Sequence, residues 1–323
     1  MWNPVLDMLS KEFYVSGEAM SNQLGITRMA IWKKIEALRE QGWRIESGAK
    51  KGYHLEMGDR IEPELWRWRL LTQWCGKAEM FYQTEVDSTN RVLKQLALEG
   101  AGNGSVALCE RQTAGRGRLG RQWISEPGVG LWQSVLLRPS LRPSQAPLLT
   151  FVAAISMAQA LEKNEVDRVR IKWPNDLVLD GKKICGILNE VSCDPDTIEY
   201  VVLGVGLNVK HGAIPEGLEK TAGSLEDAGF TVLRRDIMVS YLECLERNVD
   251  IVERKGFGAL TQTYAGYSCT FGSDVEVIGQ SERFTGEAKG MDESGALLVE
   301  DPAGVIHRVM AGDVSVRGVM GYV

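Results

Sequence analysis

A stretch rich in glycine and arginine, TAGRGRLGRQW at 113–123, most restricts how the middle of this chain can fold. Its glycines fit G-x-G-x-x-G, which opens the helix of a dinucleotide-binding fold, and also have the spacing that begins a P-loop. Arg121 stands where a P-loop needs lysine. Pro127, Gly128 and Gly130 exclude the helix that a dinucleotide fold needs. The stretch is therefore either a solvated turn or an anion-binding loop of another kind, in which glycines admit the anion and arginines pair with it.

The composition places the chain among ordinary globular proteins with more than one domain. It has 323 residues, of which 44% are hydrophobic and 25% charged, which is enough for two or three domains. Its formal net charge of −6 argues against binding nucleic acid over the whole surface. Any contact with DNA must therefore come from a local basic patch.

Cysteine spacing and the first residues bear on where the protein works. Six cysteines without C-x-x-C spacing and three histidines indicate neither a zinc site nor a disulfide framework, and scattered thiols predict a cytoplasmic location. The first residues have no basic n-region, so no signal peptide is expected. The apolar stretch 146–161 contains polar residues and is shorter than the roughly 20 residues of a membrane span. It predicts a buried helix and no membrane partner.

The first 60 residues predict two helices joined by a tight turn. Residues 16–24 form the first helix, Gly25 makes the turn, and Thr27 caps a second helix that runs to about residue 41. The inner face of the second helix, at helical spacing, consists of Ile31, Ile35 and Leu38. Its outward face carries Arg28, Trp32, Lys33 and Arg39. This is a helix-turn-helix arrangement.

Two alternating segments, 43–47 and 52–56, predict a wing with its basic tip at Lys50 and Lys51. Between residues 28 and 51 the chain has seven lysines and arginines against three glutamates, although the protein is acidic overall. A winged helix that binds DNA is therefore favoured over a helical bundle with a solvated basic face. The expected DNA contacts are Arg28, Trp32, Lys33, Lys50 and Lys51.

Residues 61–266 predict a sheet covered by helices, and residues 267–323 predict a small β-barrel. The expected strands are 105–109, 131–137, 169–172, 183–191 and 198–205, and the expected helices are 90–98, 147–161 and 234–254. In the tail, short alternating runs at 274–278 and 296–299 are separated by glycines. The expected domains are therefore 1–60, 61–266 and 267–323.

Four further clusters in the central region invite a functional interpretation. The hydroxyls of DSTN at 87–90 can bind a polar head group or simply cap a helix. KWPND at 172–176 places a lysine, an amide and a carboxylate across a proline turn, a set suited to phosphate and Mg²⁺ or only to the turn. In GKKICGIL at 181–188, Lys183 lies on an apolar strand and needs an anionic partner. LGVGLN at 203–208 ends a strand with glycines and one amide.

In this order and spacing, the motifs DSTN, GRGRLGRQW, KWPNDL, GKKICGIL and GVGLN resemble those of the biotin protein ligases. The helix-turn-helix makes the chain similar to bifunctional members that also repress the biotin operon, and the resemblance covers nearly the whole chain. It implies an α+β fold with an N-terminal winged helix and a central mixed sheet with helices, related to the class II aminoacyl-tRNA synthetases. A C-terminal SH3-like β-barrel is also implied.

The resemblance also implies an activity. Biotin and ATP, with Mg²⁺, would form biotinyl-5′-adenylate, and biotin would pass to a lysine of a biotin carboxyl carrier domain of the acetyl-CoA carboxylase type. A homodimer carrying the adenylate would bind the operator DNA of biotin genes. One alternative is a lipoate-type ligase, which would lack the winged helix and the GRGR loop. The other is a non-catalytic transcription factor that senses a small molecule, which the presence of Arg116, Lys172 and Lys183 disfavours.

The resemblance assigns roles to individual residues. Biotin is expected against Ser88, Thr89, Asn90, Gln112, Gly115, Arg116, Gly117, Arg118, Trp123, Lys183 and Gly186. ATP is expected against Arg118, Arg121, Lys172, Asn175, Asp176 and Asn208, with Mg²⁺ near Asp176. The residues expected to stabilise charge during the reaction are Lys183, Arg116 and Arg118. Two features depart from the family pattern: Leu119 stands where the best-known bifunctional member has arginine, and 211–227 lacks the tryptophan expected over the adenylate.

Overall fold

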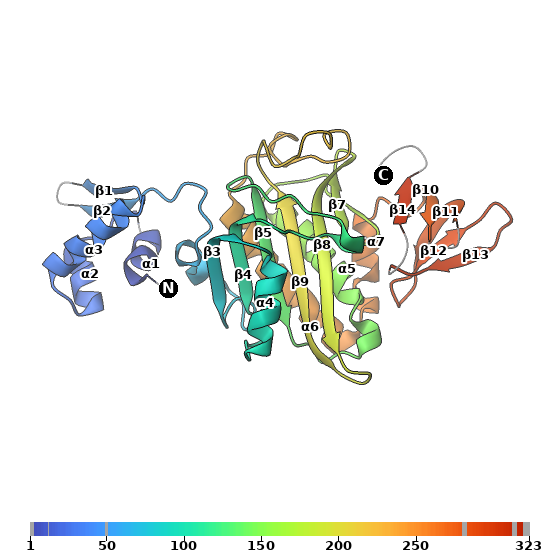
Figure 1. The fold of residues 1–323 in the computed structure, drawn as a ribbon, viewed down its shortest axis with the longest axis horizontal. Coiled ribbons are helices and arrows are strands. Elements are labelled where there is room, and N and C mark those ends of the chain that lie inside the picture. The colour runs from blue at the N-terminus through green and yellow to red at the C-terminus, as the bar shows by residue number, and fades with distance from the viewer. Residues whose placement is uncertain (1–2, 12, 49–50, 280–282, 312–314, 319–323) are drawn as a thin grey trace. The chain divides into compact units, whose positions relative to one another are not determined.

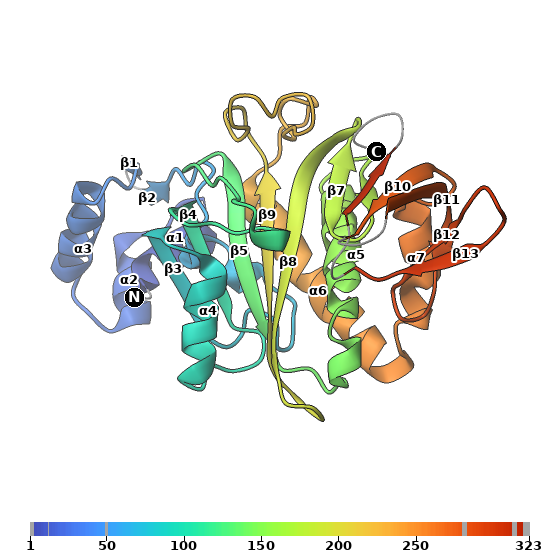
Figure 2. The same cartoon turned by 45° about the vertical axis from the view of Figure 1, so that its right-hand side comes forward.

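The computed structural model describes residues 3–11, 13–48, 51–279, 283–311 and 315–318 (Figure 1 and Figure 2). The chain forms two compact units: Met1–Leu70 with Leu233–Arg235, and Leu71–Val232 with Asp236–Val323. The short segment Leu233–Arg235 belongs to the first unit because the buried Arg234 donates hydrogen bonds to the carboxylate of Asp59. These bonds run from its backbone N–H at 2.7 Å and from its Nε at 3.0 Å.

The first unit contains the predicted helix-turn-helix. Its helices are α1 (Pro4–Lys11), α2 (Gly17–Leu24) and α3 (Arg28–Glu40), followed by the short 3₁₀ helices η1 (Pro63–Leu65) and η2 (Arg67–Arg69). Ser16 and Thr27 cap α2 and α3 by accepting hydrogen bonds from backbone N–H groups at 3.0 and 3.2 Å. Gly25 ends α2 in the left-handed conformation. Both predicted helices are confirmed, whereas α1 has no counterpart among the expected elements.

The predicted wing is confirmed as an antiparallel pair, β1 (Ile45–Gly48) and β2 (Gly52–Leu55). Val15 forms a single antiparallel bridge to β2, because its backbone exchanges hydrogen bonds of 2.9 and 2.8 Å with Tyr53. Gly52 has a φ of 103°, and a Cβ at this position would lie 2.2 Å from the carbonyl oxygen of Val15. Glycine is therefore required where the wing meets the segment before α2.

Helix α3 packs with the face that its periodicity predicts. Ile31, Ile35 and Leu38 are at most 2% exposed. Arg39 does not face outward as expected, since its guanidinium donates hydrogen bonds of 2.9 and 2.6 Å to the carbonyl oxygen of Ile45. The long side chain reaches the first wing strand, so Arg39 joins α3 to the wing instead of standing available to DNA.

A seven-stranded mixed sheet forms the centre of the second unit. Its order is β3-β4-β5-β9-β8-β7-β6, in which β3 and β4 are parallel and the other neighbouring pairs are antiparallel. The strands are β3 (Met80–Val86), β4 (Val106–Gln112), β5 (Gly130–Leu137), β6 (Arg170–Lys172), β7 (Asp176–Leu179), β8 (Lys182–Cys193) and β9 (Ile198–Asn208). The five expected strands are confirmed, and β7 forms directly after the turn that KWPND predicted.

Helices cover both faces of this sheet (Figure 1 and Figure 2). One face is covered by α4 (Thr89–Leu98), and the other by α5 (Leu148–Lys163) and α6 (Arg234–Lys255), with α7 (Gly258–Tyr267) beside α5. Two short 3₁₀ helices, η3 (Arg118–Gly120) and η4 (Pro143–Gln145), lie in the connections. Leu93 and Ala97 of α4 pack on Leu136 and Val202 of the sheet. The three expected helices of this region are confirmed.

Helix α5 is the most apolar helix of the central region. With the turn before it, the segment Pro143–Lys163 is long and apolar enough to cross a membrane by length and composition alone. However, 72% of its apolar window is buried inside the protein. The segment is therefore a core helix packed on the sheet, as the polar residues within it predicted.

A five-stranded antiparallel sheet follows α7, in the order β13-β12-β11-β10-β14. Its strands are β10 (Asp274–Ile278), β11 (Arg283–Met291), β12 (Leu297–Glu300), β13 (Ile306–Val309) and β14 (Ser315–Gly318). Trp173 contacts this sheet, because its indole N–H donates to the carbonyl oxygen of Gly295 at 3.1 Å and its backbone N–H donates to Oγ1 of Thr270 at 2.9 Å. The tail that was expected to form a small β-barrel forms an antiparallel sheet, and KWPND lies next to it.

Candidate functional site

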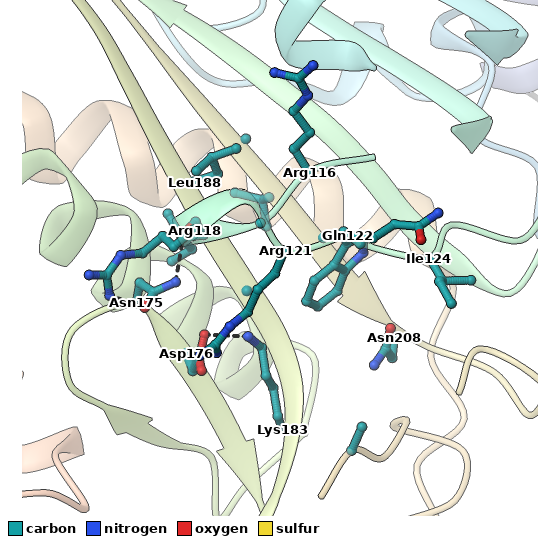
Figure 3. Close-up of a pocket in the computed structure, with 18 of the residues that line it drawn as sticks. Arg116, Arg118, Arg121, Gln122, Ile124, Asn175, Asp176, Lys183, Leu188 and Asn208 are labelled. Atoms are coloured by element: carbon teal, nitrogen blue, oxygen red, sulfur yellow. Dashed lines mark hydrogen bonds and ion pairs between the residues drawn. The ribbon is translucent and has the colours of Figure 1, made fainter. Parts of the chain in front are cut away.

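One large cavity, of about 830 Å³, opens beside the central sheet (Figure 3). It is lined by the start of α4, the loop 113–123, KWPND, the start of β8 and the end of β9. All the residues expected to contact biotin or ATP line this cavity, apart from Gly115. The structure therefore brings together, in one site, motifs that lie far apart in the sequence.

Gly115 shapes the loop rather than the cavity. A Cβ at this position would lie 2.4 Å from the carbonyl oxygen of Trp123. The carbonyl of Gly115 also accepts a hydrogen bond from the backbone N–H of Trp123 at 3.0 Å. Glycine is therefore needed for the two arms of the loop to meet, and their meeting positions the Trp123 ring over the sheet.

Glycines form the floor of the cavity beneath Trp123. Gly186 on β8 and Gly206 on β9 are cross-strand partners, so they share one face of the sheet. A Cβ would lie 2.8 Å from the Trp123 ring at Gly186 and 2.4 Å from it at Gly206. Gly186 was predicted from the sequence as a site residue, whereas Gly206 was not. The alternating glycines of GVG contained the signal, since a period of two places both on one face.

Cationic side chains gather at one end of the cavity (Figure 3). The Nζ of Lys183 lies 2.6 Å from Oδ1 of Asp176, which is the anionic partner that its burial required. The same Nζ lies 5.2 Å from the centroid of the Trp123 ring, within cation–π range. Arg121 extends toward the Lys183–Asp176 pair, whereas Arg116 points away from it. This end of the cavity therefore offers several cations to an anionic ligand.

Arg118 is held by two different segments of the second unit. Its guanidinium donates hydrogen bonds to Oδ1 of Asn175 at 3.0 Å and to the carbonyl oxygen of Ala311. Burial lowers the pKa of the Arg118 guanidinium, Asp176 raises it, and the neighbouring Arg121 lowers it again. A partly desolvated cation beside another cation is an environment that an added anion would stabilise.

The tip of the loop 113–123 departs from ordinary backbone geometry. The backbone N–H of Gly117 donates to the carbonyl of Arg121 at 2.7 Å, which closes a tight turn. Within that turn Leu119 has a φ of 57°, a left-handed conformation that costs a non-glycine residue about 1–2 kcal/mol. Its side chain is 58% exposed. The position where the chain departs from the family pattern is therefore strained and faces solvent.

The segment 211–227 packs against β8 beside Lys183. The backbone N–H of Lys183 donates to the carbonyl of Thr221 at 2.9 Å, and the N–H of Gly223 donates to the carbonyl of Lys183 at 3.0 Å. The amide of Asn208 also donates to the carbonyl of Gly223, at 3.2 Å. The lining residues from this segment are Ala213, Pro215, Leu218, Lys220, Thr221 and Ala222. Ala213, Pro215, Leu218 and Ala222 thus place aliphatic side chains at the cavity in the segment where the family pattern has a tryptophan.

The candidate DNA contacts lie in the first unit. Arg28, Trp32 and Lys33 are exposed on α3, and Trp32 is exposed by 48%. Lys51 is exposed in the wing, with its Nζ 5.6 Å from the centroid of the Tyr14 ring. Lys50 lies outside the residues that the structure describes. These exposed basic groups and the indole are suited to phosphate and groove contacts.

Comparison with known proteins matches three parts of the chain to family models. Residues 81–208 match the biotin/lipoate A/B protein ligase family, residues 3–54 match an HTH domain, and residues 270–317 match the biotin protein ligase C-terminal domain. Biotin protein ligase from Aquifex aeolicus, solved in complex with biotin and ATP, is 30% identical with a TM-score of 0.65, covering 74% of this chain and 99% of that one.

Two curated relatives extend over the first unit as well. The bifunctional ligase/repressor BirA of Bacillus subtilis is 34% identical, with 93% of each chain covered. The protein of the same name from Escherichia coli is 31% identical, with 97% of this chain and 96% of that one covered. The chain belongs to the biotin protein ligase family.

Proposed function

We propose that this protein joins biotin to ATP to form biotinyl-5′-adenylate and then transfers biotin to a lysine of a biotin carboxyl carrier domain. The observation that carries the proposal is the cavity, where DSTN, the GRGRLGRQW loop, KWPND and GKK meet around a cationic end. Family membership supports the same reaction. A lipoate-type ligase would not be expected to match an HTH domain and a biotin protein ligase C-terminal domain, as this chain does.

The two ends of the cavity suit the two substrates. Its polar and glycine-lined end would hold biotin, against Ser88, Thr89, Asn90, Gln112, Gly117, Trp123 and Gly186. Its cationic end would hold ATP, against Arg118, Arg121, Lys172, Asn175, Asp176 and Asn208. Apolar rings and glycines accept the body of a small ligand, while a few polar groups orient it.

The first step would join a carboxylate oxygen of biotin to the α-phosphorus of ATP, with pyrophosphate leaving. Two anions meet and a third departs, so fixed positive charge is the main catalytic requirement. Lys183, Arg116 and Arg118 would supply it. Arg116 points away from Lys183 in this structure, so its contribution requires the loop to move when the ligand binds.

In the second step the amine of the carrier lysine would attack the carbonyl carbon of the mixed anhydride, and AMP would leave. Lys183 would stabilise the charge that develops on the carboxyl oxygen.

Mg²⁺ is usually held by one or two carboxylates together with substrate phosphates, and Asp176 is the acidic side chain that lines the described cavity. Among the described residues, no group of three or more His, Cys, Asp or Glu side chains is placed to hold a metal ion.

The experiment that tests the ligase proposal is incubation of the protein with biotin, Mg²⁺ and ATP labelled at the α-phosphate. Labelled biotinyl-5′-adenylate should appear, and adding a biotin carrier domain should convert it to labelled AMP and biotinylated carrier. Replacing biotin with lipoate is the matched control. Protein that makes no adenylate from biotin, or makes it equally from lipoate, contradicts the proposal.

Replacing Gly206 with alanine is expected to weaken biotin binding about tenfold or more, because overpacking costs about 1–3 kcal/mol. The new methyl group would lie 2.4 Å from the Trp123 ring and would push it off the floor of the cavity. Titration calorimetry with biotin measures the loss. Gly266→Ala in α7 is the control, since a Cβ there meets nothing within 4 Å. Similar biotin affinity in both variants would be inconsistent with this floor.

The loop is expected to be mobile without ligand and ordered with the adenylate. Glycines at 115, 117, 120, 128 and 130 leave the segment 115–130 little intrinsic rigidity, and its arginines gain an anion to hold when the adenylate binds. Hydrogen exchange of this segment should therefore slow on addition of biotin and ATP, while exchange in α5 stays the same. Equal protection in both states would indicate a preformed site.

We also propose that the protein represses biotin genes as a homodimer in the cytoplasm. Residues 1–60 would bind operator DNA, 61–266 would catalyse ligation, and 267–323 would form a C-terminal SH3-like β-barrel. Two half-sites read by two winged helices give more specificity than one.

Among the described strands, β8 pairs with β7 only over 182–186 and beyond that only with β9. A second copy can pair with the remaining edge, and sedimentation with and without biotin plus ATP tests this.

A further inference from the structure

The outward face of α3 divides into two unlike halves. Residues 29, 33, 36 and 40 lie along one stripe of the helix, because they are separated by four, three and four positions. The stripe begins with Met29 and Lys33 and ends with Glu36 and Glu40. DNA presents negatively charged phosphates, which disfavour the acidic end of the stripe and attract Lys33. The half of α3 that is suited to enter a groove is therefore its N-terminal half.

Met29 projects from this N-terminal half away from the core of the first unit. It lies about half a turn from both Ile31 and Leu38, which are buried. Its own side chain is 64% exposed although it is apolar. Long side chains on helices point back toward the N-terminus, so the thioether extends over the first turn of α3. Met29 therefore presents an apolar group at the leading end of the helix.

The backbone that carries Met29 is held in place by its neighbours along the chain. Oγ1 of Thr27 accepts a hydrogen bond from the backbone N–H of Ala30 at 3.2 Å, which fixes the first turn of α3. Ile31 is fully buried, which anchors the same turn to the core. The position of Met29 is therefore set by the fold, while its thioether is free to adapt to a surface.

The charges around Met29 indicate what that surface is. Arg28 and Lys33 are exposed beside it on the same helix. Between residues 28 and 51 the chain has seven lysines and arginines against three glutamates, in a protein whose formal net charge is −6. A local excess of cations on an acidic protein favours a polyanion as the partner. The apolar group of Met29 therefore meets DNA, and not a second protein surface.

We infer that Met29 contacts the C5 methyl group of a thymine in the major groove of the operator. It rests on the proposed repressor function and adds to it the base that one side chain reads. The thymine methyl is the apolar group that base pairs present in the major groove. Arg28 and Lys33 supply affinity through phosphates, which carry no sequence information directly. Met29 then adds a preference for thymine at one position of each half-site.

Replacing thymine with deoxyuridine tests this contact, because it removes the methyl group and leaves every hydrogen-bonding group of the base pair in place. The DNA is the protein's own biotin-gene promoter, bound by the full chain with biotin and ATP at one fixed salt concentration. Equivalent thymines of the two half-sites are replaced together, one pair at a time. At one such pair, wild-type affinity should fall about tenfold, since two buried methyl groups lose their contact.

Met29→Ala should bind the unmodified promoter about tenfold more weakly and show no further loss at that thymine pair. Alanine favours the helix, so α3 should remain folded. Met29→Leu, which keeps an apolar side chain, should keep the sensitivity to deoxyuridine. Met310→Ala is the matched control, because Met310 follows β13 and is also exposed, by 52%. It should bind within about twofold of wild type and keep the wild-type response to every replacement.

Lys33→Ala separates the methyl contact from affinity for phosphate, since it should weaken binding to both DNAs equally and keep the response to deoxyuridine. Wild-type protein that binds the promoter specifically but responds to deoxyuridine at no thymine pair overturns the inference alone. The same response in Met29→Ala and the wild type overturns it as well. Wild-type protein that binds the promoter and unrelated DNA equally removes the repressor proposal, and the inference with it.

Discussion

Replacing Lys183 with alanine is expected to lower the rate of biotinyl-adenylate formation by about 10²–10³-fold or more, the usual cost of removing a preorganised charge from an active site. Lys183 is the cation that lies 2.6 Å from Asp176 at the end of the cavity where two anions must meet. Without Lys183, the charge of Asp176 is no longer balanced by that cation. The Asp176 carboxylate then repels the incoming phosphate. Biotin-dependent release of pyrophosphate measures the effect.

The neighbouring Lys182 provides the control for Lys183, because it is exposed at the start of the same strand. Lys182→Ala should retain activity within about threefold. Adding Asp176→Asn to Lys183→Ala should restore part of the lost rate if electrostatic repulsion contributes to the loss, as coupled neighbours are not additive. Unchanged pyrophosphate release in a folded Lys183→Ala protein would remove Lys183 from the mechanism.

Biotin together with ATP is expected to tighten binding to the protein's own biotin-gene promoter by about 5–150-fold, the usual range of coupling between two sites. The adenylate would order the cavity loops and favour the homodimer, and two winged helices would then bind two half-sites. The measurement compares promoter and unrelated DNA at one fixed salt concentration, because phosphate contacts make affinity depend on salt.

Two variants separate the parts of this regulatory prediction. Lys183→Ala protein, which should make little adenylate, should bind the promoter equally with and without biotin plus ATP. Lys33→Ala should weaken binding in both conditions, because Lys33 is exposed on α3 and its contact does not depend on the ligand. Identical, sequence-independent binding by the wild type in both conditions would contradict the repressor role and leave the ligase proposal unaffected.

Features that depend on neighbouring residues were predicted correctly from the sequence. The caps Ser16 and Thr27, the turn at Gly25 and the inner face of α3 follow from local hydrogen bonding and from a period of 3.6 residues. The five expected central strands were found for the same reason, since their apolar runs are bounded by turn residues. The motifs themselves, with their order, were enough to indicate the family.

Contacts between residues that lie far apart in the sequence were decided only by the tertiary structure. Arg39 bonds to the wing and Gly206 lies under Trp123, which no local pattern specifies. The partner of Lys183 was required by the sequence, but its identity as Asp176 depends on how β7 and β8 pair. Periodicity and capping are properties of consecutive residues, whereas these contacts depend on strand register and on side chains reaching between elements. The sequence by itself therefore determined the elements and their chemistry, and the register of the sheet determined which of those groups meet.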